Sequence, residues 1–327
     1  MENTVSLSPD IISRFKPSLV FKHYKEEINS IDISRDGKFL VVCSNDGRIN
    51  YYDIVRGEKI NTYMMSEGYG ISWVKFTNHE KNILVASSKD NVHSVYYWSL
   101  HDNVILAKFL GHESRIVSID VNSCFSYFVT VANDESAIIW DFNKVEPVAE
   151  FSECQAAWND NTGKVLACSH SPKTSDQNAI YLYNVEEEIF EKSFSSLFLQ
   201  EDKEIGQIKR MKFSYDGKFI MCIDSKSNLF IVDAYEGGII SKLSNAYDDV
   251  IVSPLVADIT PCSQYVVIGF NKKWSIWDWN NNKEYPLTDI HAKHIKAIRF
   301  NTEFWMFSSG WQNLVIWTLD LPESSDS

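Results

Sequence analysis

A repeat of about 45 residues is the feature of this sequence that most limits how the chain can fold. Short strand-like segments rich in Val, Ile, Phe, Tyr and Trp close at Tyr52, Trp98, Trp140, Tyr183, Val232, Trp277 and Trp317. Successive closing residues lie about 40 to 50 residues apart, close to the length of a four-stranded propeller blade. The seven units therefore predict an all-β chain folded as a seven-bladed β-propeller.

The interiors of the units share one order of elements. Residues 28–53 and 208–233 each contain an alternating strand, an Asp-Gly turn, an apolar strand, a polar turn and a third strand. We expect the turns at Asp36–Gly37 and Asp216–Gly217 to be tight hairpins with positive φ angles. Residues 17–24 precede the first unit, and we expect this amino-terminal segment to supply the outer strand of the last blade and so close the ring.

Composition indicates the bounds of the folded domain, the cellular compartment and the kinds of ligand that the chain can bind. We predict one folded domain over residues 14–320, between a flexible amino terminus at 1–13 and a disordered acidic tail at 321–327. The amino terminus is polar, which argues against a signal peptide, and no apolar run approaches membrane-spanning length. Six cysteines without C-x-x-C spacing favour reduced thiols in the cytosol or nucleus. A net charge of −13 repels phosphates, so we expect no direct nucleic-acid binding.

Motifs for catalysis or metal binding are missing from the sequence. It contains no Gly-x-Ser-x-Gly and no His-Glu-x-x-His. His291 and His294 lie three residues apart, but they precede a strand-like segment and have no third ligand nearby. We therefore expect a non-enzymatic protein without a metal or another cofactor.

The third unit contains the residues of a known repeat. Gly-His at residues 111–112 and Trp-Asp at 140–141 resemble the motif pairs of WD40 repeats. In that family a His, a Ser or Thr, an Asp and a Trp bond to one another within a blade. The matching residues here are His112, Thr130, Asp134 and Trp140. An imidazole can bond a carboxylate and a hydroxyl at once, and the hydroxyl can accept the indole N–H. Other units have lost much of this set, so we expect apolar packing to hold them.

Candidates for partner binding lie in turns that we expect at one mouth of the channel. Trp311 comes in the turn before the last strand, where an exposed Trp would be a good anchor, although it could instead fold over its own blade. Tyr69, Arg115 and Tyr247 come just before inner strands and would line the same face. We predict that Trp311→Ala weakens partner binding without unfolding the protein, and unchanged affinity in a calorimetric titration would contradict this.

A closer resemblance extends over nearly the whole chain. It is carried by residues 15–47, 96–122, 213–240 and 294–317, with the most specific parts at 99–103 and 233–238. These segments resemble the Swd-two family, the WD-repeat subunit shared by two nuclear complexes. One is COMPASS, which methylates histone H3 at lysine four. The other is the cleavage-and-polyadenylation machinery, where the family joins a type-one phosphatase module in transcription termination.

The resemblance implies a non-catalytic scaffold in the nucleus, a monomeric propeller within a hetero-complex. Its implied partners are the amino-terminal region of the methyltransferase, the phosphatase regulatory subunit, or both. The chain departs from the family where residues 129–142 lack a Ser-Gly-Ser run and where the loop of the fourth unit is longer. Which complex it serves therefore stays open. The alternative is a reader of a modified histone or ubiquitin surface, but a methyl-lysine site needs converging aromatics and a carboxylate, and the candidates here are dispersed.

Overall fold

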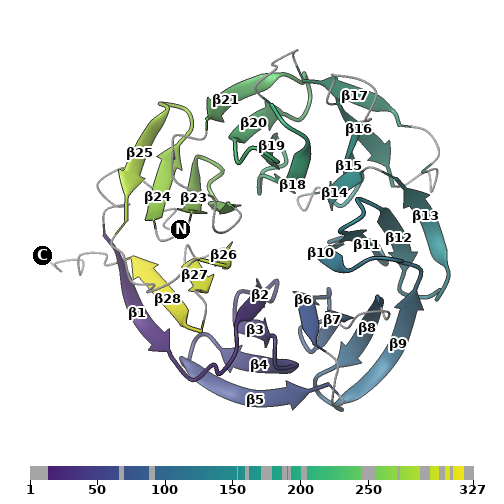
Figure 1. Ribbon diagram of the computed structural model, residues 1–327, viewed down its shortest axis with the longest axis vertical. Coiled ribbons are helices and arrows are strands. Elements are labelled where there is room, and N and C mark those ends of the chain that lie inside the picture. The colour runs from purple at the N-terminus through teal and green to yellow at the C-terminus, as the bar shows by residue number, and fades with distance from the viewer. Residues whose placement is uncertain are drawn as a thin grey trace, which may run out of the picture.

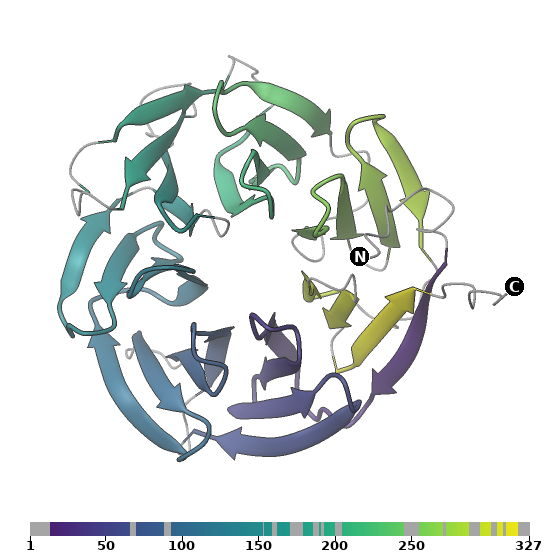
Figure 2. The ribbon, with the colours of Figure 1, turned by 180° about the vertical axis from the view of Figure 1, so that it is seen from behind.

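In the computed structural model, most of the chain forms a ring of β-sheets around a central channel (Figure 1). The described residues are 14–65, 70–87, 93–152, 154–158, 162–170, 179–185, 190, 193–199, 205–244, 255–270, 273–287, 295–301, 306–309 and 312–319. They form 28 strands in seven four-stranded sheets, and the view from behind shows the same ring (Figure 2). The prediction of an all-β propeller is confirmed.

The first four sheets along the chain each run from an inner strand at the channel to an outer strand at the rim. They are β2 (Ile28–Ile33), β3 (Phe39–Ser44), β4 (Arg48–Asp53) and β5 (Glu58–Met64); β6 (Ile71–Phe76), β7 (Asn82–Ser87), β8 (Ser94–Ser99) and β9 (Val104–Leu110); β10 (Ile116–Val121), β11 (Tyr127–Ala132), β12 (Ala137–Asp141) and β13 (Pro147–Phe151); and β14 (Cys154–Trp158), β15 (Val165–His170), β16 (Ala179–Asn184) and β17 (Ser195–Phe198).

The remaining three sheets follow the same order. They are β18 (Ile208–Phe213), β19 (Phe219–Asp224), β20 (Leu229–Asp233) and β21 (Ile239–Leu243); β22 (Val256–Ile259), β23 (Tyr265–Phe270), β24 (Lys273–Asp278) and β25 (Lys283–Pro286); and β26 (Ala297–Phe300), β27 (Met306–Ser309), β28 (Leu314–Leu319) and β1 (Phe15–Phe21). The outer strand β1 pairs antiparallel with β28, with Pro17 opposite Trp317. The first and last described strands therefore share one sheet.

The burial of the strands explains their composition. Each sheet packs between two neighbours, so its second strand is covered on both faces and reads as a continuous apolar run; all six residues of β11 are buried. Outer strands face solvent, and β25 has no buried residue. Trp98, Trp140, Trp277 and Trp317, at which four of the units close, are buried.

Tryptophans also pack between neighbouring sheets. The rings of Trp274 on β24 and Trp317 on β28 have centroids 5.7 Å apart, and both belong to one apolar cluster that joins two sheets. Trp277 and Trp279 contact the sheet on the other side, which contains β19 and β20. Each large apolar side chain buried in this way stabilises the fold by roughly 1.5–3 kcal/mol.

The Asp-Gly turns differ from the expected hairpins. Gly37 has a φ of 71° and Gly217 a φ of 71°, but neither Asp36 nor Asp216 adopts a positive φ. The Gly37 N–H donates to the Ser34 carbonyl at 2.9 Å, which is the four-residue turn of a longer hairpin loop that ends in a left-handed glycine. The prediction was wrong for the aspartates because the loop between β2 and β3 is longer than two residues.

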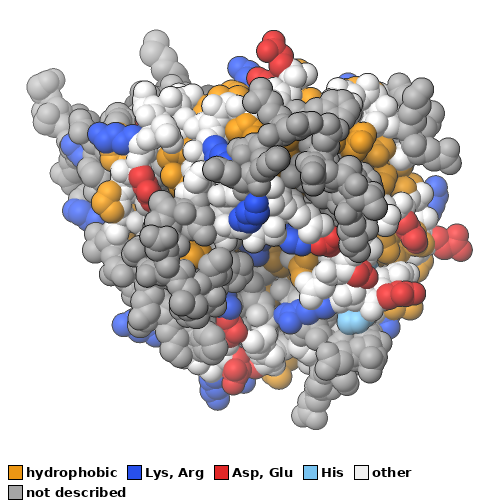
Figure 3. All heavy atoms as spheres, turned by 45° about the horizontal axis from the view of Figure 1, so that its top comes forward, with side chains coloured by type: hydrophobic (Ala, Val, Ile, Leu, Met, Phe, Trp, Pro, Cys, Tyr) orange, Lys and Arg blue, Asp and Glu red, His pale blue; other side chains and the backbone are white. Residues whose placement is uncertain are grey.

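The surface mixes exposed hydrophobic side chains with charged ones (Figure 3). Among the described residues no helix is long and apolar enough to cross a membrane, and no group of three His, Cys, Asp or Glu side chains is placed to hold a metal ion. The six cysteines are free thiols. The segments predicted to be a flexible amino terminus and an acidic tail lie outside the described residues, as do His291 and His294.

Candidate functional site

The centre of the ring is a cavity of about 510 Å³ to which the inner strands of all seven sheets contribute. In and directly behind its wall, charged side chains recur at one place in six of the seven inner strands, the residue before the last. The seven residues at this place are Asp32, Lys75, Asp120, Ala157, Lys212, Asp258 and Arg299. Negative and positive charges alternate around the channel, and the alternation is interrupted at Ala157. We call these seven residues the charge ring.

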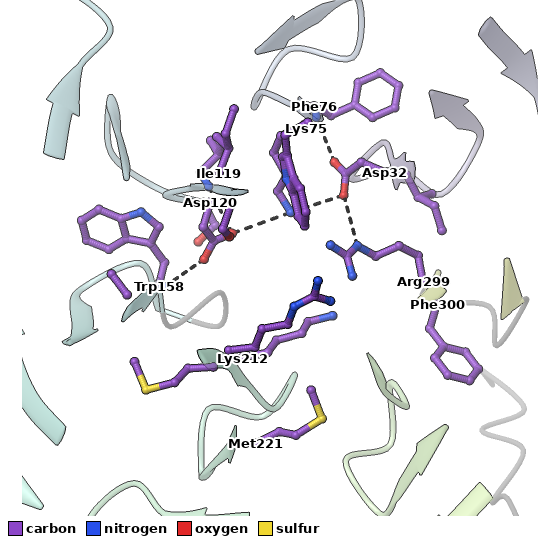
Figure 4. Close-up of a pocket in the computed structure, with 18 of the residues that line it drawn as sticks. Asp32, Lys75, Phe76, Ile119, Asp120, Trp158, Lys212, Met221, Arg299 and Phe300 are labelled. Carbon is purple, nitrogen blue, oxygen red and sulfur yellow. Dashed lines mark hydrogen bonds and ion pairs between the residues drawn. The ribbon is translucent and has the colours of Figure 1, made fainter. Parts of the chain in front are cut away.

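Ion pairs connect neighbours in the charge ring across the boundaries between sheets. The Lys75 ammonium lies 3.3 Å from the Asp32 carboxylate and 3.7 Å from that of Asp120. The Arg299 guanidinium lies 3.8 Å from the same Asp32 carboxylate (Figure 4). Lys212 pairs with Asp258 at 2.5 Å. These cations are about three-quarters covered, so water screens the pairs less than it screens pairs at an open surface.

Each aspartate of the charge ring also bonds to the backbone of the next sheet. Asp32 accepts the N–H of Phe76 at 2.8 Å, and Asp120 accepts that of Trp158 at 2.9 Å. Asp258 accepts the N–H of Phe300 at 2.9 Å. The same bond thus recurs at three sheet boundaries, where it satisfies a buried donor and fixes the offset between neighbouring inner strands. The geometry gives these carboxylates a structural role.

The four residues that match the WD40 motif lie together in the third sheet, joined through a fifth. The Trp140 indole N–H donates to the Thr130 hydroxyl at 2.9 Å, and Thr130 Oγ1 lies 2.6 Å from His112 Nε2. The other imidazole nitrogen lies 3.1 Å from the Ser136 hydroxyl, which donates to Asp134 at 2.7 Å. The expected contact between imidazole and carboxylate therefore runs through Ser136, whose role the sequence pattern did not reveal.

Burial sets the protonation state of this network. Removal from water lowers the pKa of His112 to about 4, against an opposing effect of the Asp134 carboxylate, so the imidazole is neutral at physiological pH. In the second sheet, by contrast, the buried Trp98 indole N–H has no hydrogen-bond partner among the described residues. Such a sheet depends on apolar packing, as expected from the loss of the motif.

Of the four predicted partner-binding residues, the structure describes one. Arg115 precedes β10, its side chain is exposed, and its carbonyl accepts the N–H of Asn133. Tyr69, Tyr247 and Trp311 lie outside the described residues, so the grouping of all four at one mouth stays a prediction.

The outer strand β9 carries a surface that we did not predict from sequence. It pairs with β8 on one side only, and its other edge is free of strands among the described residues. Four of its apolar side chains are about half exposed, with exposed fractions of 52% for Val104, 47% for Ile105, 50% for Leu106 and 57% for Leu110, whereas Phe109 is buried. The neighbouring outer strand β5 adds Ile60 and Met64, also more than half exposed. Three consecutive apolar residues in a strand without alternation are the sequence signal for this surface.

Comparisons with known proteins agree with the fold. The family model of the WD domain, G-beta repeat, matches residues 15–53 and 103–141. The chain is 28% identical to WD repeat-containing protein 82 of Drosophila melanogaster over 98% of this chain and 99% of that protein. It is 26% identical to Set1 complex component swd2 of Schizosaccharomyces pombe, over 75% of this chain and 69% of the relative. The COMPASS component SWD2 of Saccharomyces cerevisiae is 26% identical over 72% and 70%.

Proposed function

We propose that this WD40-repeat protein, a relative of the Set1-complex and COMPASS components named Swd2, is a non-catalytic scaffold subunit of a nuclear complex of that kind. Its task is to hold an extended segment of a larger subunit against the rim of the propeller. The observation that carries the proposal is the free edge of β9 together with its four exposed apolar side chains.

Strand β9 has the two features that bind an extended peptide. Its free edge presents backbone N–H and C=O groups, to which an added strand can hydrogen-bond. The side chains of Val104, Ile105, Leu106 and Leu110 are all about half exposed, and exposed apolar groups beside a free edge gain free energy when a partner covers them. The outer strand β25 contrasts with β9 because it exposes no large apolar side chain.

The partner within this proposal is the amino-terminal region of the methyltransferase: the names of two relatives favour a Set1 or COMPASS complex, and the resemblance to the Swd-two family implies that region as the partner. The resemblance of the sequence to the Swd-two family adds a second setting, the phosphatase regulatory subunit of the polyadenylation machinery. Both partners can use one surface, since strand addition reads mainly backbone atoms.

The alternative of a methyl-lysine reader is less favoured by the channel. Trp73 and Trp158 line it together with the Asp32 and Asp120 carboxylates, which are the residue types that such a site needs. However, Lys75 and Arg299 already pair with Asp32. These cations repel a methylated ammonium group, so the channel is poorly suited to it.

A pair of matched variants tests the scaffold proposal. Leu106→Arg places a charge on the proposed surface, while Ile240→Arg places the same charge on β21, where Ile240 is 47% exposed. Affinity purification at endogenous expression followed by mass spectrometry should recover the larger subunit with the wild type and Ile240→Arg, and lose it with Leu106→Arg. Equal recovery with both variants contradicts a role of β9.

The same purification separates the two settings. Methyltransferase subunits alone indicate a dedicated COMPASS subunit, phosphatase and polyadenylation subunits alone indicate the termination machinery, and both sets indicate a shared scaffold. If neither set is recovered with the wild-type chain, the scaffold proposal is wrong.

A further inference from the structure

Positive charge gathers in the channel of a protein that is acidic as a whole. The chain has a net charge of −13, yet its cavity is lined by six cations against two carboxylates. The cations are Arg35, Lys75, Lys209, Arg210, Lys212 and Arg299, and the carboxylates are Asp32 and Asp120. Two further acids behind the wall, Asp258 and Glu135, pair with Lys212 and Lys209. The channel is therefore a local site of positive potential.

One of these cations differs from the others. Lys75, Lys209, Lys212 and Arg299 each have a carboxylate partner, and Arg35 donates to the Ser123 carbonyl at 2.7 Å. Arg210 is the one lining cation for which the described part of the chain offers no ion pair or hydrogen bond. It projects from the inner strand β18, two residues before Lys212 in the charge ring. Its five N–H donors are thus available to a ligand.

The surroundings of Arg210 favour an anion. The protein around the channel reduces its contact with bulk water, and the charge of Arg299 acts in the same direction; together they lower the pKa of Arg210 to about 10. The guanidinium still carries its charge at neutral pH and its side chain is exposed within the channel, so it is accessible to a counterion. An anion beside both arginines would relieve their mutual repulsion.

We propose that Arg210 and Arg299 bind a phosphate group of a small anion inside the central channel. The planar fork of a guanidinium matches phosphate oxygens through paired hydrogen bonds. A cavity of about 510 Å³ has the size of a small-molecule site, and its wall also holds the neutral polar side chains of Ser118 and Gln155. Long polyanions are disfavoured because the acidic outer surface repels them. This proposal is independent of partner binding at β9.

Isothermal titration calorimetry of the full chain with inorganic pyrophosphate at constant ionic strength tests the proposal. Wild-type protein should bind saturably at one site, and Arg210→Gln should weaken binding about tenfold or more. Arg56→Gln is the matched control: it removes the same charge from an exposed hairpin at the rim and should leave affinity unchanged. Absence of saturable heat with wild-type protein, or equal affinity of Arg210→Gln and wild type, overturns the site.

Two further measurements remove the remaining ambiguities. In thermal unfolding without ligand, Arg210→Gln should be at least as stable as wild type, because the substitution breaks no bond to a described residue. A loss of binding in this variant then cannot be ascribed to unfolding. Titration with citrate separates phosphate from carboxylate recognition. Weaker binding of citrate than of pyrophosphate supports a phosphate ligand, whereas tighter binding of citrate overturns that assignment.

Discussion

The carboxylate of Asp258 accepts the backbone N–H of Phe300 at 2.9 Å, and the same side chain lies 2.5 Å from the Lys212 ammonium. Lys212, Asp258 and Phe300 belong to three successive sheets. The Asp258 side chain is fully buried, so one carboxylate joins three sheets where water cannot replace it. The cohesion of the ring therefore depends on polar contacts at the channel as well as on apolar packing between the sheets.

The first prediction concerns this carboxylate. Asp258→Ala leaves the Lys212 ammonium and the Phe300 N–H without their acceptor in a buried place, and should lower the free energy of unfolding by roughly 3–5 kcal/mol. Chemical denaturation measures the change. Glu150→Ala removes an exposed carboxylate from the outer strand β13 and should change stability by less than about 0.5 kcal/mol. Similar losses of unfolding free energy for the two variants would show that Asp258 does not stabilise the contact between sheets.

The second prediction concerns the hydrogen-bond network of the third sheet. Thr130→Val preserves the shape of the side chain but removes the hydroxyl that bonds both His112 and Trp140, leaving buried polar atoms unsatisfied. The free energy of unfolding should fall by about 1–3 kcal/mol. Thr318→Val on β28, where the side chain is partly exposed, is the control and should be nearly neutral. Urea denaturation that finds Thr130→Val as stable as wild type would refute the role of the network.

The third prediction follows from the pKa of His112. Burial lowers this pKa from 6.5 to about 4, so between these values only the unfolded chain takes up the proton. The free energy of unfolding should therefore fall as the pH decreases from about 6.5 toward 4, by an amount on the order of 1–3 kcal/mol. At higher pH the imidazole is neutral in both states and contributes no pH dependence.

Two histidine variants isolate this contribution from that of other titrating groups. His112→Gln should show a shallower loss of stability over this pH range than wild type. His101→Gln, at a side chain that is 67% exposed, should keep the wild-type slope. Denaturation curves at several pH values supply the comparison, and identical slopes for all three proteins would exclude His112 as the source.

The fourth prediction compares two glycines with positive φ angles. An added Cβ at Gly163, with φ of 64°, would lie 2.8 Å from Asn122 Oδ1 and from Cys124 Cβ. At Gly238, with φ of 86°, it would meet no atom within 4 Å. Gly238→Ala should cost about 1–2 kcal/mol of stability from backbone strain alone, and Gly163→Ala should cost more. Thermal unfolding distinguishes the two, and an equal cost would mean that the loop at Cys124 moves freely.

Much of the architecture could be predicted because it depends on short stretches of chain. The residues that close the seven units, from Tyr52 to Trp317, lie in the third strand of each sheet, counted from the inner strand, from β4 to β28. Aromatic and β-branched runs between turn residues specify strands locally. The conformation of the turns could not be predicted in the same way. Whether Asp36 lies in a two-residue hairpin or in a longer loop depends on the residue at which β3 begins to pair with β2.

The candidate site could be predicted only in part. His112, Thr130 and Trp140 were found because a known motif places them within one unit, whereas Ser136 escaped notice because it has no place in that motif. The apolar run of β9 is visible in the sequence, but its exposure could not be predicted. Exposure depends on which strand of the sheet lies outermost, at the rim.

By itself, the sequence determined the strands, their period and the propeller, because these follow from hydrophobic patterns and turn residues that act over a few positions. The tertiary structure alone decided the charge ring. Asp32, Lys75 and Asp120 are separated in the chain by more than 40 residues each, and they meet only because ring closure brings the ends of successive inner strands around one channel. Which charges pair, and that Arg210 is left without a partner among the described residues, depends on the offset between sheets, which no local pattern encodes.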